Sequence, residues 1–268
     1  MTRQKPIATN WAIITGGSSG IGLALAERLA RRGCHVVIAS RNSSRLAEAA
    51  SAEGLETLTL DVTDAGAVAA AMGALIARLG PPAWLVTSAG EAVPGHFLDQ
   101  PLAEHAAQWN VNYLGTLNVL HALAPAMTCA GRGQVILISS AAALGGFYGY
   151  AGYAASKWAV RGLGEVLGLE LGAHGVRVLT AFPPDTDTPQ LARERALRPA
   201  PTARFAASNV ALSPGQVADA ILRAADSGRA RVAPGAGAAF LLFAGPVFAR
   251  YLAWQQRRLL RRHPEDLS

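Results

Sequence analysis

The sequence predicts an α/β fold in which helices cover both faces of a parallel sheet. From Trp11 onward, short runs rich in β-branched residues alternate with longer helical patterns. The strand runs are apolar along nearly their whole length, which is typical of parallel strands buried on both faces. Hydrophobic residues make up 51% of the 268 residues and charged residues 16%, so we expect a large buried core rather than disorder. Together these features indicate a Rossmann-like, doubly wound sheet.

The expected elements alternate along the chain. We expect strands at 11–15, 36–40, 57–61, 84–88, 134–139 and 176–181. We expect helices over 21–32, after a cap at Ser43 or Ser44, from a cap at Asp64 to just before Gly80, through Trp109 and Leu120, and over 153–171. Ligands of such sheets bind beyond the carboxyl ends of the strands, so the loops that follow the strands are the places to look for chemistry.

We expect a single Rossmann-type catalytic domain over 1–232 and a separate C-terminal segment over 233–268. Within the domain, the stretch 190–213 contains Pro199, Pro201 and several arginines. It is placed like a mobile lid over a substrate cleft, although a plain surface excursion would have the same composition.

The C-terminal segment combines an apolar run with a basic end. Residues 233–249 carry no charge, and Tyr251, Trp254 and two arginine pairs at 257–258 and 261–262 follow them. A membrane-spanning helix needs about 20 apolar residues, and prolines and glycines interrupt this run. The pattern favours an anchor at the membrane interface, which predicts a cytoplasmic protein held peripherally at the cytoplasmic face of a membrane. A buried core segment or a contact in a homo-oligomer is the alternative.

Several classes of function are disfavoured. The net charge is +6 and the pI about 9.9, but no nucleic-acid motif accompanies the basic residues, so we expect no nucleic-acid partner. Residues 1–10 contain no apolar run of signal-peptide length, which argues against secretion. Cys34 and Cys129 lack a disulfide or metal spacing, and the histidines have no metal-ligand spacing, so we expect no metal.

A glycine-rich loop, Thr15-Gly-Gly-Ser-Ser-Gly-Ile-Gly22, joins the first strand to its helix. Glycines at these positions permit a tight turn and close approach of a pyrophosphate, which the helix N-terminus stabilises. The serine hydroxyls can also donate to phosphate. We therefore predict a dinucleotide site rather than an ordinary glycine turn, with these cofactor-binding residues: Gly16, Ser18, Ser19, Gly20, Ile21 and Gly22.

The end of the second strand indicates which dinucleotide binds. NAD-binding proteins place an acidic residue there for the ribose 2′-hydroxyl, whereas this chain has Arg41, followed by Arg45. A guanidinium matches the 2′-phosphate of NADP in charge and geometry, so we predict NADPH, with solvent-facing arginines as the alternative. Asp61 is placed to accept from the adenine amino group, unless it is a helix cap.

Ser140, Tyr153 and Lys157 form the candidate reactive group. Tyr153 and Lys157 are four residues apart and therefore share a helix face. Tyrosine has a pKa of about 10 in water. We expect the lysine ammonium, and the oxidised nicotinamide, to lower that pKa and make Tyr153 an acid–base group. Ser140 follows a strand, where its hydroxyl can contact the substrate oxygen.

Across 11–227 the chain resembles the short-chain dehydrogenase/reductase family. The glycine loop, Asn112 in Val-Asn-Tyr-Leu-Gly, Ser140 and Tyr153-x-x-x-Lys157 carry the resemblance. It implies that Tyr153 protonates a substrate carbonyl while hydride arrives from the nicotinamide, that Lys157 also binds the nicotinamide ribose, and that Asn112 supports a proton relay. It extends the cofactor site to a further set of residues: Val62, Ala89, Gly90, Pro183, Thr186 and Thr188. One departure is Thr87-Ser88 where the family has Asn-Asn, which puts sheet-stabilising hydrogen bonds in doubt.

The string Pro183-Pro-Asp-Thr-Asp-Thr-Pro189 indicates which class of ketone is the substrate. It resembles the members of that family that reduce a long-chain sphingoid ketone with NADPH, and Arg41-Asn42 and Arg161-Gly-Leu163 agree. The resemblance implies an NADPH-dependent oxidoreductase acting on CH–OH/C=O groups. A reductase of another hydrophobic ketone, such as a steroid or a 3-oxoacyl lipid, and a non-catalytic NADP-binding scaffold or redox sensor remain alternatives. By itself the proline-rich string could also be a stiff turn with helix-capping side chains.

Overall fold

The computed structural model describes residues 10–207 and 210–263. The polar N-terminal stretch, residues 208–209 of the expected lid and the last five residues of the C-terminal segment lie outside the described residues. Side chains at 51–53 and 246–248 also lie outside them.

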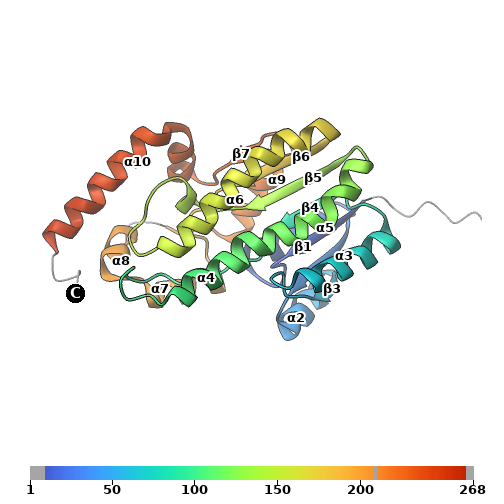
Figure 1. Cartoon of the computed structure of the whole chain (residues 1–268), viewed down its shortest axis with the longest axis horizontal. Coiled ribbons are helices and arrows are strands. Elements are labelled where there is room, and N and C mark those ends of the chain that lie inside the picture. The colour runs from blue at the N-terminus through green and yellow to red at the C-terminus, as the bar shows by residue number, and fades with distance from the viewer. Residues whose placement is uncertain (1–9, 208–209, 264–268) are drawn as a thin grey trace, which may run out of the picture.

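The sheet has seven parallel strands in the order β3-β2-β1-β4-β5-β6-β7 (Figure 1). Their bounds are β1 (Trp11–Thr15), β2 (His35–Ser40), β3 (Glu56–Thr59), β4 (Trp84–Thr87), β5 (Gly133–Ile138), β6 (Val176–Ala181) and β7 (Arg231–Val232). The chain builds outward in one direction as far as β3 and then returns to begin β4 on the other side of β1. This order confirms the predicted doubly wound sheet and places its switch point between β1 and β4.

Helices cover both faces of the sheet (Figure 1). Their bounds are α1 (Gly20–Arg31), α2 (Ser43–Glu53), α3 (Ala65–Leu79), α4 (Leu102–Trp109), α5 (Gly115–Cys129), α6 (Ala151–Glu170), α7 (Pro189–Leu197), α8 (Ala200–Ala206), α9 (Pro214–Asp226) and α10 (Ala236–Arg262). One core cluster packs α1, α2 and α9 against the sheet. The other packs α3, α5 and α6 against the opposite face.

The sequence of β1 explains how the two cores form. Successive strand side chains point to opposite faces. Accordingly, Ala12 and Ile14 enter one cluster, and Trp11 and Ile13 enter the other. All four side chains are fully buried, and burying an isoleucine side chain contributes roughly 1.5–3 kcal/mol.

Two expected helices differ in detail. The long helix through Trp109 and Leu120 is divided into α4 and α5 by a π-helical turn, Asn110–Leu114. In addition, α2 is capped by Asn42, whose Oδ1 accepts from the backbone N of Arg45 at 2.9 Å, rather than by Ser43 or Ser44. An asparagine amide reaches the first-turn N–H groups as readily as a serine hydroxyl does.

The expected lid is largely helical, because it forms α7 and α8. Thr188 caps α7 by accepting from the N of Leu191 at 3.2 Å, and Leu191 and Thr202 are buried. These buried contacts argue against a plain surface excursion. Motion of this segment stays a prediction.

The last helix, α10, extends away from the sheet beyond α8 (Figure 1). It bends at Gly245, whose φ of 55° is non-helical. Among the described residues, no single helix has the length and hydropathy of a membrane span. The two limbs Ala236–Gly245 and Ala249–Arg262 meet that test only together, across a bend of 117°.

Candidate active site

A large cleft opens at the carboxyl ends of the central strands. Its volume is about 1320 Å³, and it runs from the glycine loop past Ser140, Tyr153 and Lys157 to α7 and α10. This is the edge where the doubly wound topology predicts ligand binding. The structure therefore brings the predicted cofactor loop and the predicted reactive group to one site.

The glycine loop has a shape that larger residues would disturb. Gly16 and Gly20 have φ values of 68° and 57°, which favour glycine. A Cβ on Gly22 would lie 2.4 Å from the carbonyl oxygen of Gly16. Gly22 packs against the backbone of Gly16 and does not line the cleft. The following residues of the loop line the cleft: Gly16, Ser18, Ser19, Gly20 and Ile21. An open backbone at the start of α1 fits the pyrophosphate of a dinucleotide.

The predicted 2′-phosphate residues also line the cleft. Arg41 is 58% exposed in its side chain and lies 3.8 Å from the Asp61 carboxylate and 3.7 Å from that of Glu91. These contacts are too long for hydrogen bonds. The guanidinium therefore has N–H groups to offer, and Arg45 faces the same end of the cleft.

Asp61 does not contribute to the wall of the cleft, although its neighbours Leu60 and Val62 do. Its Oδ1 accepts from the backbone N and the hydroxyl of Thr63, at 2.9 and 2.8 Å. The cap of α3 is Asp64. Asp61 thus forms a local turn, and its predicted contact with adenine stays a prediction.

Tyr153 and Lys157 lie one turn apart on α6, and Ser140 follows β5. Lys157 is only 5% exposed, and its Nζ donates to the carbonyl oxygen of Ile138 at 3.0 Å. The same Nζ lies 5.7 Å from the centroid of the Tyr153 ring. All three predicted reactive residues line the cleft, so the spacing in the sequence identified a real juxtaposition.

The pKa values of this pair differ from the expectation. Burial raises the pKa of Tyr153, and the nearby Glu194 and Asp185 carboxylates raise it further, against a hydrogen bond from Ser140 that lowers it. Burial also lowers the pKa of Lys157 to about 8, although Glu194 opposes this shift. In the protein alone, burial thus gives Tyr153 a net rise in pKa, where a lowered value was expected. The separate effects of the Lys157 ammonium and of a bound oxidised nicotinamide stay predictions.

Asn112 is buried in the π-helical turn and does not line the cleft. Its Oδ1 accepts from Glu91 N at 2.9 Å, and its Nδ2 donates to Glu91 O and Ser156 Oγ, both at 2.9 Å. Asn112 thus ties the loop after β4 to α6. A role in a proton relay stays a prediction.

The departure Thr87-Ser88 lies where β4 ends and the next loop begins. Ala89 and Gly90 line the cleft as predicted, and a Cβ on Gly90 would lie 3.2 Å from Lys157 Nζ. The Thr87 hydroxyl is buried without a hydrogen-bond partner among the described residues. The sheet-stabilising hydrogen bond that this departure put in doubt is therefore not made by the Thr87 hydroxyl.

The proline-rich loop after β6 lines the cleft through Pro183, Thr186 and Thr188. The Thr186 hydroxyl donates to the carbonyl of Pro184 at 2.8 Å. Thr188 caps α7, and its Cγ2 lies 2.9 Å from where a Cβ on Gly20 would be. The loop is therefore a capped turn and also a wall of the predicted cofactor site.

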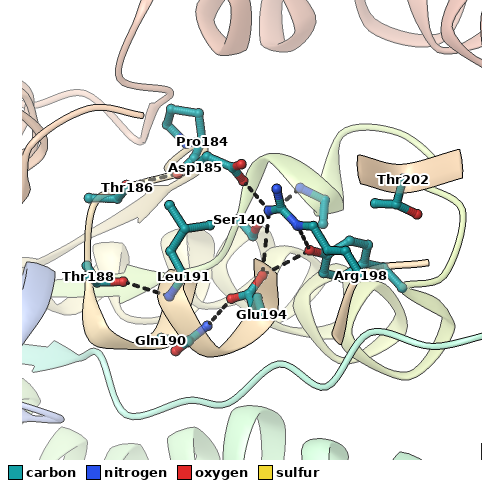
Figure 2. Close-up of polar contacts among 12 residues, drawn as sticks. Ser140, Pro184, Asp185, Thr186, Thr188, Gln190, Leu191, Glu194, Arg198 and Thr202 are labelled. Carbon is teal, nitrogen blue, oxygen red and sulfur yellow. Dashed lines mark hydrogen bonds and ion pairs between the residues drawn. The ribbon is translucent and has the colours of Figure 1, made fainter. Parts of the chain in front are cut away.

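Sequence reasoning missed a buried polar group that lies beside Tyr153. Arg198 Nη2 lies 2.9 Å from Asp185 Oδ1 and 3.9 Å from Glu194 Oε2, and Figure 2 shows the guanidinium between these two carboxylates. The Tyr150 hydroxyl donates to Glu194 Oε2 at 3.0 Å and accepts from Arg198 Nε at 2.8 Å. One signal was present: Glu194 is the only acid among the arginines of 189–206.

The comparisons with known proteins agree with this geometry. A model of the short chain dehydrogenase family matches residues 10–198. The chain is 33% identical to a 3-ketodihydrosphingosine reductase of Bos taurus over 84% of this chain and 71% of that protein. It is 38% identical to the 3-dehydrosphinganine reductase TSC10B of Arabidopsis thaliana over 80% of this chain and 66% of that protein. A crystal structure of a short-chain dehydrogenase from Streptomyces avermitilis superposes with a TM-score of 0.78 at 25% identity, covering 96% and 97% of the two chains.

The fold and the site define a nicotinamide-dependent oxidoreductase that acts on CH–OH/C=O groups. The chain belongs to the short-chain dehydrogenase/reductase family. Within that family it is similar to reductases named for 3-ketodihydrosphingosine, also called 3-dehydrosphinganine.

Proposed function

We propose that this enzyme reduces the ketone of 3-ketodihydrosphingosine to give sphinganine, with NADPH as the reductant, in sphingolipid biosynthesis. The observation that carries the proposal is the position of Tyr153. Its side chain lies with Ser140 and Lys157 in a cleft that also contains the glycine loop and an apolar wall from α10. The likeness to 3-ketodihydrosphingosine reductases supports the choice of ketone.

The chemistry requires one hydride and one proton. Gly16, Ser18 and Arg41 of the cleft would hold NADPH, which would supply the hydride to the carbonyl carbon. Tyr153 donates its phenolic proton to the carbonyl oxygen, and Ser140 donates a hydrogen bond to the same oxygen. The ketone thus becomes a secondary alcohol, and the tyrosinate left behind regains a proton from solvent. The Lys157 ammonium stabilises that tyrosinate across the 5.7 Å between Nζ and the ring.

The preference for NADPH over NADH rests on Arg41 and Arg45. Both line the cleft at the end of β2, where the chain has no acidic residue to accept from a ribose 2′-hydroxyl. A dianionic 2′-phosphate would replace the long contacts of Arg41 with direct charge-assisted hydrogen bonds.

The part of the cleft beyond Tyr153 suits a long acyl chain. Phe240, Leu241 and Leu259 of α10 contribute to its wall.

On the outside of the same helix, Phe243 is 91% exposed. Exposed aromatics next to a basic end are typical of a helix at a membrane interface. These features support peripheral attachment at the cytoplasmic face of a membrane, from which the substrate would enter along α10.

A panel of ketones tests the proposal. Purified enzyme is incubated with NADPH and 3-ketodihydrosphingosine, a 3-ketosteroid or a 3-oxoacyl thioester, and the loss of NADPH absorbance is followed. We expect the highest kcat/KM for 3-ketodihydrosphingosine. A higher value for the steroid or the thioester would assign the site to another hydrophobic ketone, and no turnover of any of them would favour a binding scaffold.

A further inference from the structure

Glu194 places a buried carboxylate in the cleft that contains Tyr153. Its residue is 8% exposed, yet it lines the cleft together with Tyr153 and Asp185. A buried carboxylate normally requires a matched positive charge. Here two carboxylates, Glu194 and Asp185, share the guanidinium of Arg198 (Figure 2), so this group of three carries one negative charge in excess. Lys157 is the nearby cation that Glu194 acts on, but its Nζ donates to the carbonyl oxygen of Ile138.

The excess charge belongs mainly to Glu194. Arg198 is hydrogen-bonded to Asp185 at 2.9 Å, whereas its distance to Glu194 is 3.9 Å. The hydrogen bonds that Glu194 accepts come from neutral groups, the Tyr150 hydroxyl at 3.0 Å and the Gln190 amide at 2.9 Å. These donors hold the carboxylate in one orientation, but they do not neutralise it.

The uncompensated charge affects the pKa values of the groups around it. Burial raises the pKa of Glu194 itself above its usual range. The Glu194 carboxylate also contributes to the raised pKa of Tyr153 and acts on Lys157. A carboxylate in this position makes a tyrosine a poorer proton donor. A cation bound beside Glu194 would remove that disadvantage.

The proposed substrate carries such a cation. A 3-ketosphingoid base has an ammonium group on the carbon next to its ketone, so the ammonium must lie within a few atoms of the oxygen that Tyr153 protonates. We propose that the Glu194 carboxylate, oriented by Tyr150 and Gln190, binds the ammonium group of the substrate and thereby positions the neighbouring ketone at Tyr153. This inference rests on the proposed function and names the residue that selects an amino ketone.

Binding of the ammonium would also make Tyr153 a better proton donor. With a cation against Glu194, the negative field at Tyr153 decreases, and its phenol becomes the stronger acid that proton donation needs. A neutral ketone of the same length would leave the field in place. The enzyme would therefore favour amino ketones in kcat as well as in KM.

The test compares two ketones on two variants. The ketones are 3-ketodihydrosphingosine and 1-hydroxyoctadecan-3-one, which has the same chain without the amine. Glu194→Gln keeps the shape and removes the charge. Glu170→Gln is the matched control, because Glu170 is exposed on α6 and does not line the cleft. Thermal unfolding of each variant confirms that it is folded.

We expect Glu194→Gln to lose kcat/KM for the amino ketone by a factor on the order of 100 and to keep or increase its activity on the deaminated ketone. Glu170→Gln should behave as the wild type with both. An equal loss on both ketones would overturn the proposal, because it would show that Glu194 is only structural.

A measurement on the wild type covers the case in which Glu194→Gln does not fold. Sphinganine should then compete with the substrate more strongly than octadecane-1,3-diol does, and equal inhibition would overturn the role of the carboxylate. Failure of the proposed function looks different. In that case the wild-type enzyme reduces neither ketone, whereas equal reduction of both ketones refutes only the ammonium site.

Discussion

The Nζ of Lys157 lies 5.7 Å from the centroid of the Tyr153 ring, and the backbone carbonyl of Ile138 holds it there through a 3.0 Å hydrogen bond. The ammonium is therefore fixed by the end of β5 and not by the tyrosine. This arrangement keeps a positive charge near the phenol before and after the proton leaves.

Replacing Tyr153 with phenylalanine should remove the proton donor and keep the ring. We expect kcat with 3-ketodihydrosphingosine to fall by a factor of about 10² to 10⁴, with little change in cofactor binding. Steady-state kinetics and a fluorescence titration with NADPH check both parts. Tyr113→Phe is the control, since Tyr113 packs on Trp109 away from the cleft. Unchanged turnover of Tyr153→Phe would refute the mechanism.

The lowered pKa of Lys157 predicts a dependence of stability on pH. Its pKa is about 8 in the folded protein and 10.5 in the unfolded chain. Between these values the unfolded chain binds more protons, so the free energy of unfolding rises with pH. We expect wild type to gain stability relative to Lys157→Met from about pH 8 toward pH 10. Urea unfolding of both proteins measures this, and a constant difference would contradict a buried, titrating lysine.

Arg41→Ala tests the choice of cofactor. Because the guanidinium is expected to bind the 2′-phosphate, the KM for NADPH should increase by a factor of about 10 to 100, while the KM for NADH stays unchanged. Arg132→Ala, on the exposed turn before β5, serves as a control. If both cofactors lose the same amount, Arg41 has another role.

The exposed Phe243 tests membrane attachment. Phe243→Ser should weaken co-sedimentation of the full chain with anionic phospholipid vesicles by a factor of about 10 or more, because burial of such a side chain contributes roughly 1.5–3 kcal/mol. Leu98→Ser is the matched control, since Leu98 is 92% exposed in the loop before α4. Equal binding of all three proteins would instead favour a protein contact for α10.

The sequence was sufficient to predict the strands and the reactive group, because both depend on local spacing. Apolar runs alternating with helical patterns predicted six of the seven strands, and the i, i+4 spacing placed Lys157 beside Tyr153. The two-residue β7 was missed, since so short a strand has no periodicity to detect. Glu194 was also missed, because only the packing of α7 brings its carboxylate into the cleft that contains Tyr153. The rise that burial causes in the pKa of Tyr153 was also not predicted, because burial cannot be read from spacing.

Tracing the hydride tests the central claim most directly. The wild-type enzyme is incubated with 3-ketodihydrosphingosine and NADPH that carries deuterium at the transferred C4 position, and the lipid product is analysed by mass spectrometry. We predict sphinganine with one deuterium on C3, formed by wild type and lost in Tyr153→Phe. Unlabelled sphinganine, or no sphinganine at all while another ketone is reduced, would contradict the account.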